Sequence, residues 1–560
     1  MAGLYDPFNG LYTQKELEKV RKYLKEELHR SLKYLKKPGK PKTYYLGYIF
    51  RNTRQEKIFG RLGSIGEQSV SSQNTVFCDL RVGSYRYDNV NDGGLNDNSD
   101  KDESVDYIFT PAEIEENAFK YALWKLTDAR YREAAEQYYD RESRQLHYID
   151  TNRALPSKRK GESFKSVKYK KFPEIETDYW KYLIRKAGAL VRKFTAVKNS
   201  WFEFTTIHRQ SLLVNSEQTE SLQQQCIFEL RAFLWLLTSN GDGIVQEINL
   251  IEGDINNLPD EKSFLRAVQD KVDLLLRLQK APVLNSYTGP VLLSGEASGL
   301  FFHEVIGHRL EGSRLLSTEE GATFRDLRGK KIAPEYIDII DDPLCRQTEG
   351  TSLIGSFKYD DEGWPARRVV LVEKGVLKNF LTTSMPIPDQ KELNGHARNQ
   401  RYERPISRMG NLFIVNRQPV PEAEMKERFL EEIRAQKKPY GIYVRDTLGG
   451  ETGTSSYDFQ AFKGEIMTAY RVFPNGKEEP VRGVDFVGTP LSALEAVVCM
   501  GAKNHIDNAY CGAESGIVPV STISPPMLVR NLELQGRDRE KFTQYAIPLP
   551  YDKSRKGKIK

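Results

Sequence analysis

The sequence predicts an α/β protein of the α+β type with two domains, because its pattern of apolar residues changes near Pro282. Before Pro282, long stretches with apolar residues every three or four positions alternate with β-rich runs. After it, short β-branched runs separated by glycine turns predominate. We therefore expect an amino-terminal sheet-and-helix domain over residues 1–284, a β-rich carboxy-terminal domain over residues 285–540, and a basic tail over residues 541–560.

Helical and β-like periodicities locate the elements of the amino-terminal half. The first predicted helix begins with a capping box, in which Thr13 precedes Glu16 by three residues. An Asp-, Asn- and Gly-rich stretch over residues 88–106 predicts a polar loop. Basic residues 153–171 are interpreted as an exposed linker. We expect helices over residues 13–36, 111–146, 176–194 and 261–280, and strands within residues 43–87 and over 201–214 and 226–236.

The carboxy-terminal half is expected to contain short strands and a few helices. A helix over residues 490–502 would place Cys499 in an apolar core. We expect strands near residues 291–293, 337–340, 368–372 and 441–444, and a further helix over 421–436.

Composition excludes some classes of function. The 83 basic and 77 acidic residues of this 560-residue chain give a net charge of +6, which offers no case for nucleic-acid binding. No apolar run approaches the roughly 20 residues of a membrane span. The first residues lack the pattern of a signal peptide, although a chain whose signal had been removed would look the same. Five scattered cysteines argue against a disulfide framework, so we expect a cytoplasmic protein.

Residues 301–312 carry the most informative motif in the chain. They place His303, Glu304 and His308 within six residues. Neutral imidazole is a common zinc ligand, and a carboxylate beside a metal can take the proton from a bound water. The neighbouring residues are apolar and predict a buried helix that directs its polar side chains inward. These residues are Leu300, Phe301, Phe302, Val305 and Ile306.

The two histidines are five residues apart, whereas the usual zinc-binding helix spaces them by four. At roughly 100° per residue, an ideal helix would point His303 and His308 about 140° apart. They converge if the helix bulges or ends between them, and Gly307 is where the backbone could do so at little steric cost. The simpler interpretation is a core helix with two satisfied histidines. Because only seven histidines occur in the chain, we favour a metal site.

A catalytic zinc site normally has three protein ligands and a water, so a third ligand is required. Cys345 has no clear metal context, and Cys499 is interpreted as core. Cys511 lies in a predicted loop with a glycine beside it, where a thiol can approach a metal closely. The same context also fits a partly buried free thiol, and the residues alone do not separate these two interpretations.

From about residue 290 to 536, the sequence resembles the TldD/PmbA family of metallopeptidases. The first matching segment is the HExxxH motif at residues 303–308, with its unusual spacing. The others follow in order along the chain. They are residues 355–363 leading into 375–377, residues 408–411, residues 441–444 with the glycine pair at 449–450, and residues 510–512 followed by 518–520 and 525–528.

The resemblance implies a zinc ion held by His303, His308 and Cys511, with Glu304 as the general base that acts on a zinc-bound water. It also implies a two-domain fold whose β-rich carboxy-terminal domain surrounds the metal helix. Members of the family pair as dimers, so we expect a homodimer or a heterodimer with a related subunit. Because all four motif residues are present, the chain resembles the catalytic, TldD-like type.

We therefore expect a zinc-dependent peptidase that hydrolyses extended or unfolded peptides and has no nucleic-acid or membrane partner. The edges of its many β-runs could pair with a peptide backbone. His396, Arg408 and Tyr510 are candidates to stabilise the oxyanion, and each is also explained as a structural hydrogen-bonding residue. The leading alternative is a non-catalytic peptide-binding or assembly subunit with a structural metal, which a fourth protein ligand would favour. A metal-free interaction protein is the third possibility.

Overall fold

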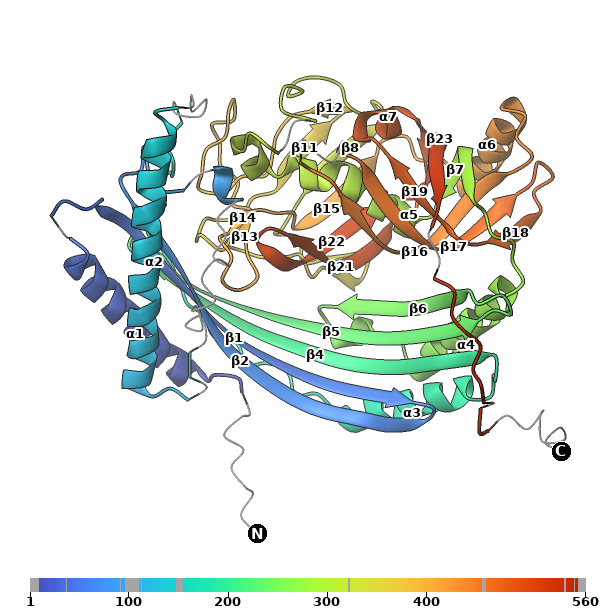
Figure 1. The fold of residues 1–560 in the computed structure, drawn as a ribbon, viewed down its shortest axis with the longest axis horizontal. Helices are drawn as coiled ribbons and strands as arrows, with labels where there is room; N and C mark the ends of the chain where they lie inside the picture. The colour runs from blue at the N-terminus through green and yellow to red at the C-terminus, as the bar shows by residue number, and fades with distance from the viewer. Residues whose placement is uncertain are drawn as a thin grey trace, which may run out of the picture.

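The computed structural model describes residues 10–36, 38–90, 92–95, 110–111, 113–147, 155–320, 323–455, 460–537, 540–547 and 549–551. Its amino-terminal half is built on one long, curved sheet (Figure 1). The strand order is β2-β1-β4-β5, with β6 and the short β3 also paired to β5. The strands are β1 (Thr43–Arg61), β2 (Ser64–Val82), β3 (Lys165–Ser166), β4 (Val197–Asn215), β5 (Glu220–Leu237) and β6 (Gly243–Glu252).

The strands of this sheet are longer than the sequence predicted. Polar residues in the middle of β1 and β2 continue the antiparallel ladder, as where Gln55 pairs with Ser71. Strand β6 was missed, because Gln246 interrupts its apolar face. The Gln246 side chain is fully buried and lies 3.3 Å from the hydroxyl of Thr468 in the other half. Backbone pairing along a long sheet therefore extends strands through residues with little β-propensity.

The predicted amino-terminal helices are confirmed as α1 (Gln14–Tyr34), α2 (Glu116–Arg144), α3 (Thr177–Val191) and α4 (Glu261–Leu278). Both halves of the capping box of α1 are present. Helices α3 and α4 pack against the sheet at the end away from α1 and α2 (Figure 1). Trp180 of α3 stacks on Phe204 of β4 at 4.0 Å between ring centroids, so aromatic packing fixes α3 on the sheet.

The interpretation of residues 153–171 as an exposed linker is wrong for Lys158. The Lys158 side chain is 1% exposed and forms an ion pair with Glu217 at 3.3 Å. Its ammonium also lies over the Tyr45 ring, 4.2 Å from the centroid. A buried carboxylate from a distant segment therefore overrides the local charge pattern.

In the predicted 88–106 loop, residues 96–106 lie outside the described residues.

The carboxy-terminal half contains two larger sheets. In the first, the pairing β16-β7-β23-β19-β17 closes into a ring because β16 also pairs with β17. The second has the order β12-β11-β8-β15-β22-β21. The first sheet comprises β7 (Ser286–Leu293), β16 (Gly441–Thr452), β17 (Phe462–Val472), β18 (Glu478–Val481), β19 (Val484–Gly488), β20 (Val497–Met500) and β23 (Met527–Gly536). The second comprises β8 (Ile337–Asp341), β11 (Val369–Glu373), β12 (Val376–Leu377), β15 (Asn411–Asn416), β21 (His505–Ala513) and β22 (Gly516–Ser524).

Helix α5 (Gly295–Phe302) contacts strands of both sheets, including β16, β21 and β22. Helix α6 (Glu422–Ala435) agrees with prediction, whereas the helix predicted over residues 490–502 is wrong beyond α7 (Pro490–Glu495). The following residues form β20, in which β-branched Val497 pairs with Val529 of β23. Cys499 is buried in the core as expected, but on a strand.

The division of the elements is consistent with the predicted domains, since the curved sheet ends at β6 and the next strand, β7, begins at Ser286. The boundary at residues 284 and 285 itself stays a prediction.

Part of the predicted tail packs on the amino-terminal sheet. Lys541 forms an ion pair with Asp242, and Phe542 meets the Trp235 ring edge-on at 5.7 Å. Residues 552–560 of that tail lie outside the described residues.

None of the described helices combines the length and the apolar character that crossing a lipid bilayer requires.

The two halves of the chain meet through buried charges. The fully buried guanidinium of Arg81 pairs with Asp79 and Asp88 of its own half and with Glu362 of the other half, at 3.1 Å from Asp79 and Glu362. Arg404 of the carboxy-terminal half also pairs with Asp79 of the amino-terminal half, at 2.5 Å.

Replacing Arg81 by methionine is expected to destabilise the fold, because three buried carboxylates would lose a shared cation. Removing one partner of a buried ion pair costs about 3–5 kcal/mol of unfolding free energy. Thermal unfolding followed by circular dichroism measures the loss. Lys120→Met is the control, since Lys120 pairs with Glu116 at the surface and should change the midpoint little. Equal midpoints for the two variants would contradict the importance of the Arg81 cluster.

Candidate metal centre

The metal motif begins in α5 and continues through a distorted turn. Ser294 caps α5 by accepting a hydrogen bond from the backbone N–H of Ala297, at 3.1 Å. After α5, residues His303–Gly307 form a single π-helical turn, and residues His308–Leu310 form a 3₁₀ turn. A π turn holds one more residue than an α turn, so side chains five residues apart come to the same side. The predicted distortion between the two histidines is confirmed.

Gly307 has a different role from the one expected. Its φ of −53° and ψ of −61° are ordinary helical values, so the turn does not need the backbone freedom of glycine. A Cβ at this position would lie 2.2 Å from the sulfur of Met409, which leaves no room for a side chain. Of the five apolar neighbours, Phe301, Phe302, Val305 and Ile306 are fully buried, as predicted, whereas Leu300 is only partly buried. Close packing against Met409 therefore favours glycine here, because any larger residue would have to displace that side chain.

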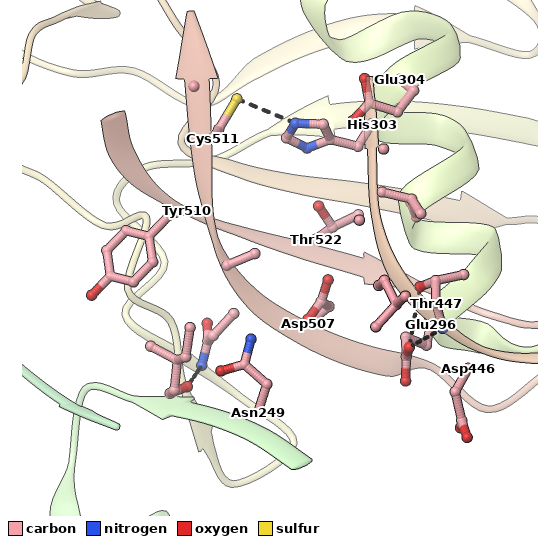
Figure 2. Close-up of a pocket in the computed structure, with 18 of the residues that line it drawn as sticks. Asn249, Glu296, His303, Glu304, Asp446, Thr447, Asp507, Tyr510, Cys511 and Thr522 are labelled. Atoms are coloured by element: carbon pink, nitrogen blue, oxygen red, sulfur yellow. Dashed lines mark hydrogen bonds between the residues drawn. The ribbon is translucent and has the colours of Figure 1, made fainter. Parts of the chain in front are cut away.

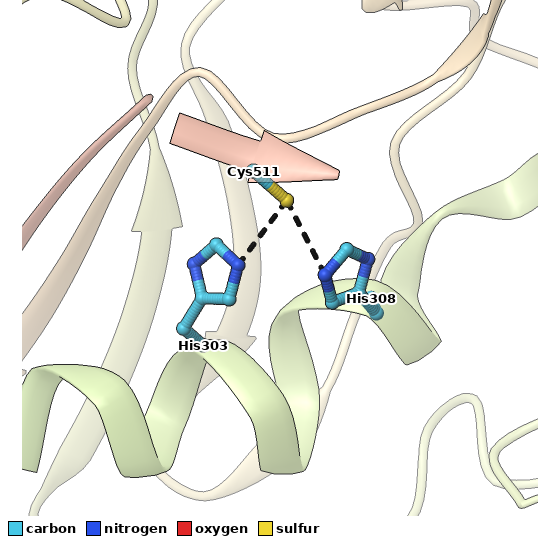
Figure 3. Close-up of side chains that lie close together, drawn as sticks. All are labelled: His303, His308 and Cys511. Atoms are coloured by element: carbon cyan, nitrogen blue, oxygen red, sulfur yellow. Dashed lines mark hydrogen bonds between the residues drawn. The ribbon is translucent and has the colours of Figure 1, made fainter. Parts of the chain in front are cut away.

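The structure brings the three predicted metal ligands together (Figure 3). The Nε2 atoms of His303 and His308 lie 3.2 and 3.3 Å from the Cys511 sulfur, and all three donor atoms lie within 4.8 Å of one another. Tetrahedral zinc with Zn–N bonds of about 2.0–2.1 Å and a Zn–S bond of about 2.3 Å separates such ligands by roughly 3.3–3.6 Å. The donor set therefore matches zinc in chemistry, and its two N···S distances lie close to the spacing that zinc requires.

Cys511 reaches this position from a strand, so its prediction as a loop residue is wrong. It lies on β21 and pairs with Val518 of β22 in an antiparallel ladder. Within the described residues, no fourth His, Cys, Asp or Glu joins the three donors. A metal held by these three donors would therefore keep a position for water or substrate.

Electrostatics favour a cation at this centre. Burial alone would raise the pKa of the Cys511 thiol, but His308, Arg408 and His303 hold it well below its ordinary value. Burial alone would lower the pKa of His308, yet the Cys511 thiolate and Glu311 raise it to about 10. The centre thus combines the Cys511 thiolate with the buried Glu311 carboxylate, and these two negative groups attract positive charge.

Glu304 lies beside the three donors and is 5% exposed. Burial raises the pKa of its carboxyl, in the direction that suits a general base. The chain makes room for it at Gly450, where a Cβ would lie 2.8 Å from the Glu304 Cγ and 3.0 Å from its Oε1, and also 2.9 Å from the backbone carbonyl oxygen of Lys463. Close approach to Glu304 is therefore a physical reason for glycine at position 450, the second residue of the glycine pair, whereas a Cβ at Gly449 would meet nothing within 4 Å.

A cavity of about 860 Å³ opens in front of the centre. Figure 2 shows His303, Glu304 and Cys511 at one end and Glu296, Asp446 and Asp507 at the other. Strand β6 forms one wall and β21 another, and both are edge strands of their sheets among the described residues. The cavity therefore lies between the outer strands of two sheets.

Of the three candidates for the oxyanion, only Tyr510 lines this cavity, and its hydroxyl donates to Glu229 at 2.6 Å. His396 is fully buried and lies 3.2 Å from Asp341, away from the centre. Arg408 is also fully buried and donates to the carbonyl of Cys511 at 2.7 Å. The structure therefore places His396 and Arg408 in internal contacts and outside the cavity.

Comparison with known proteins gives concordant results. The family model described as PmbA/TldA metallopeptidase C-terminal domain matches residues 286–536. A metalloprotease of Archaeoglobus fulgidus is 34% identical over 277 residues, which cover 48% of this chain and 57% of that protein. A zinc metalloprotease TldD homolog of Saccharolobus solfataricus is 29% identical over 300 residues, covering 51% and 62%. The chain thus spans less than two thirds of either relative.

The solved structure of TldE from Thermococcus kodakarensis resembles this chain with a TM-score of 0.58 at 15% identity. The alignment covers 92% of this chain and all of that protein. At this identity, the likeness concerns the fold alone. It extends over both halves of the chain, whereas the family model covers only the second.

Replacing Cys511 by serine is expected to weaken zinc binding more than 100-fold, because changes outside the ligand shell already cost about 10–100-fold. Competition with a chromophoric chelator measures the affinity. Cys226→Ser is the matched control, since Cys226 is a partly buried free thiol that does not join the three donors. If both variants bind zinc like the parent protein, Cys511 is not a ligand.

Proposed function

Because this chain belongs to the TldD/PmbA family, whose carboxy-terminal domain spans residues 286–536, we propose that it is a zinc-dependent peptidase acting on extended or unfolded peptides. The observation that carries the proposal is the convergence of His303, His308 and Cys511 beside Glu304, at the end of a large cavity. A zinc ion held by these three side chains would polarise a peptide carbonyl and lower the pKa of a water molecule.

Glu304 is the proposed general base. Its carboxylate would accept the proton of the attacking water and return it to the leaving amine. Its buried position supports this role, because a raised pKa keeps the carboxyl closer to the working pH and the protein wall limits competing solvent. The π turn and the 3₁₀ turn after it would hold the rings of His303 and His308 in place, so the base and these two ligands share one segment.

The shape of the cavity supports an extended substrate. Strands β6 and β21 each present an edge to it, and an edge strand can pair with the backbone of a peptide. Such pairing needs a substrate segment without its own secondary structure. This supports unfolded or loosely structured peptides over folded proteins.

The three-donor arrangement also favours a catalytic over a structural metal, because a structural zinc normally has four protein ligands. We further propose that the chain works as a dimer, with itself or with a related subunit, on the strength of its family. A cytoplasmic location is supported by its five cysteines, all of which are free thiols in the structure.

Replacing Glu304 by glutamine is expected to lower kcat for peptide hydrolysis by about 10²–10⁴-fold, because general acid–base catalysis contributes on that scale. Hydrolysis of a mixture of unfolded peptides is measured at full zinc occupancy. Glu451→Gln is the control, since Glu451 lines the same cavity but its side chain is 75% exposed. Undiminished turnover by Glu304→Gln would reject the assignment of the base.

Gly450→Ala is expected to displace Glu304 without removing a ligand. A misplacement of about 1 Å in a catalytic group can cost about 10²-fold, so kcat should fall on that scale while zinc affinity stays unchanged. The matched control is Gly512→Ala, next to Cys511, where an added Cβ meets nothing within 4 Å. Equal kcat values for the two alanine variants would show that Gly450 does not determine the position of Glu304.

A further inference from the structure

Glu311 lies in the same segment as the metal motif, three residues after His308, and is fully buried. Its Oε1 is 3.3 Å from the Nδ1 of His308, while the Nε2 of that ring faces the Cys511 sulfur. A carboxylate at Nδ1 favours the tautomer with its proton on Nδ1 and leaves the Nε2 lone pair for a metal. The contact therefore orients His308 as a ligand.

Two guanidinium groups hold the Glu311 carboxylate in place. Arg314 contacts Oε2 through its Nε at 3.0 Å and its Nη2 at 2.9 Å. The Nε of Arg408 lies 3.3 Å from Oε1. Within the described residues, His308 Nδ1, Glu311 Oε1 and Arg408 Nε have no hydrogen-bond partner, and the two contacts that join them, each 3.3 Å long, are ionic contacts. These three atoms therefore depend on one another for their polar contacts.

Arg408 connects this carboxylate to the third donor. Its Nη2 donates to the backbone carbonyl of Cys511 at 2.7 Å, and its Nη1 donates to Ser515 Oγ and to the carbonyl of Gly516. The contacts close a loop through His308, Glu311, Arg408 and Cys511, joining donors that are 203 residues apart in the sequence. The end of the β21–β22 hairpin is thus fastened to the π turn.

We propose that Glu311 and Arg408 are a positioning pair for the metal centre. Glu311 fixes the tautomer and ring orientation of His308, and Arg408 sets the position of Cys511 relative to that ring. The inference rests on the proposed function only in taking zinc as the metal. A merely structural ion cluster would affect the stability of the fold but would leave zinc affinity unchanged.

Glu311→Gln in the full-length chain tests the first part. The glutamine amide can donate to Nδ1, which favours the tautomer with the proton on Nε2 and opposes metal binding. Zinc affinity, measured by competition with a chromophoric chelator, is expected to fall by about 10–100-fold. The matched control is Glu320→Gln, which removes another carboxylate from Arg314, at 3.1 Å, and is expected to leave zinc affinity unchanged. Unchanged zinc affinity of Glu311→Gln overturns the proposal.

Arg408→Lys tests the second part and remains informative if Glu311→Gln fails to fold. Lysine keeps the charge but lacks the fork that reaches both Glu311 and the Cys511 carbonyl. Zinc affinity should again fall at least tenfold, and the thiolate-to-cobalt charge-transfer band of the cobalt-substituted protein should shift. An unchanged affinity and an unchanged band overturn the role of Arg408.

The outcomes separate this inference from the proposed function. If the unmodified chain binds zinc but cleaves no peptide, the peptidase proposal fails, and the comparison of zinc affinities still decides the positioning pair. If the chain is an active peptidase and both variants bind zinc as tightly as it does, the positioning pair fails and the peptidase stands.

Discussion

The metal centre depends on one widened helical turn. With the α-helical spacing continued, His303 and His308 would diverge, and no side chain movement alone would bring both ring nitrogens to one ion. The π turn solves this but leaves backbone carbonyls without their α-helical partners. Arg309, which is 2% exposed, donates to the carbonyl of Glu304 at 2.5 Å and also reaches the carbonyls of Gly453 and Gln460. A buried guanidinium thus stabilises the turn and ties it to the β16–β17 hairpin.

The elements around this turn hold it and complete the metal centre and its cavity. Helix α5, which precedes the turn, packs between the closed ring of strands and the six-stranded sheet. Strand β21 supplies Cys511 from the edge of the second sheet. Its backbone pairing with β22 fixes the position of Cys511 along the strand. The amino-terminal sheet contributes β6 as the opposite wall of the cavity. Buried ion pairs around Arg81 join the two halves.

Local sequence signals predicted local structure well. The capping box of Thr13 and Glu16, the apolar residues around His303, and the need for a distortion before His308 all follow from neighbours along the chain. Cys511 is different. Its own context left a ligand and a free thiol equally possible, and only the family resemblance selected it. A strand pairing across the second sheet, which no local pattern encodes, brings it to the histidines.

The errors have the same physical origin. Lys158 is buried because Glu217, distant in sequence, neutralises it. Residues 497–500 form a strand because β23 offers them a partner. Glu311 was overlooked, although its spacing of three residues after His308 was visible in the sequence and is the spacing at which helical neighbours meet. Polar residues close to a ligand along the chain are therefore worth testing as positioning groups.

The most direct test of the account is zinc K-edge X-ray absorption on the full chain loaded with zinc. The convergence of His303, His308 and Cys511 predicts two nitrogen neighbours at about 2.0–2.1 Å, one sulfur at about 2.3 Å, and one further light atom from solvent. A spectrum without a sulfur neighbour would contradict the account, because it would mean that the π turn and β21 do not meet at the metal.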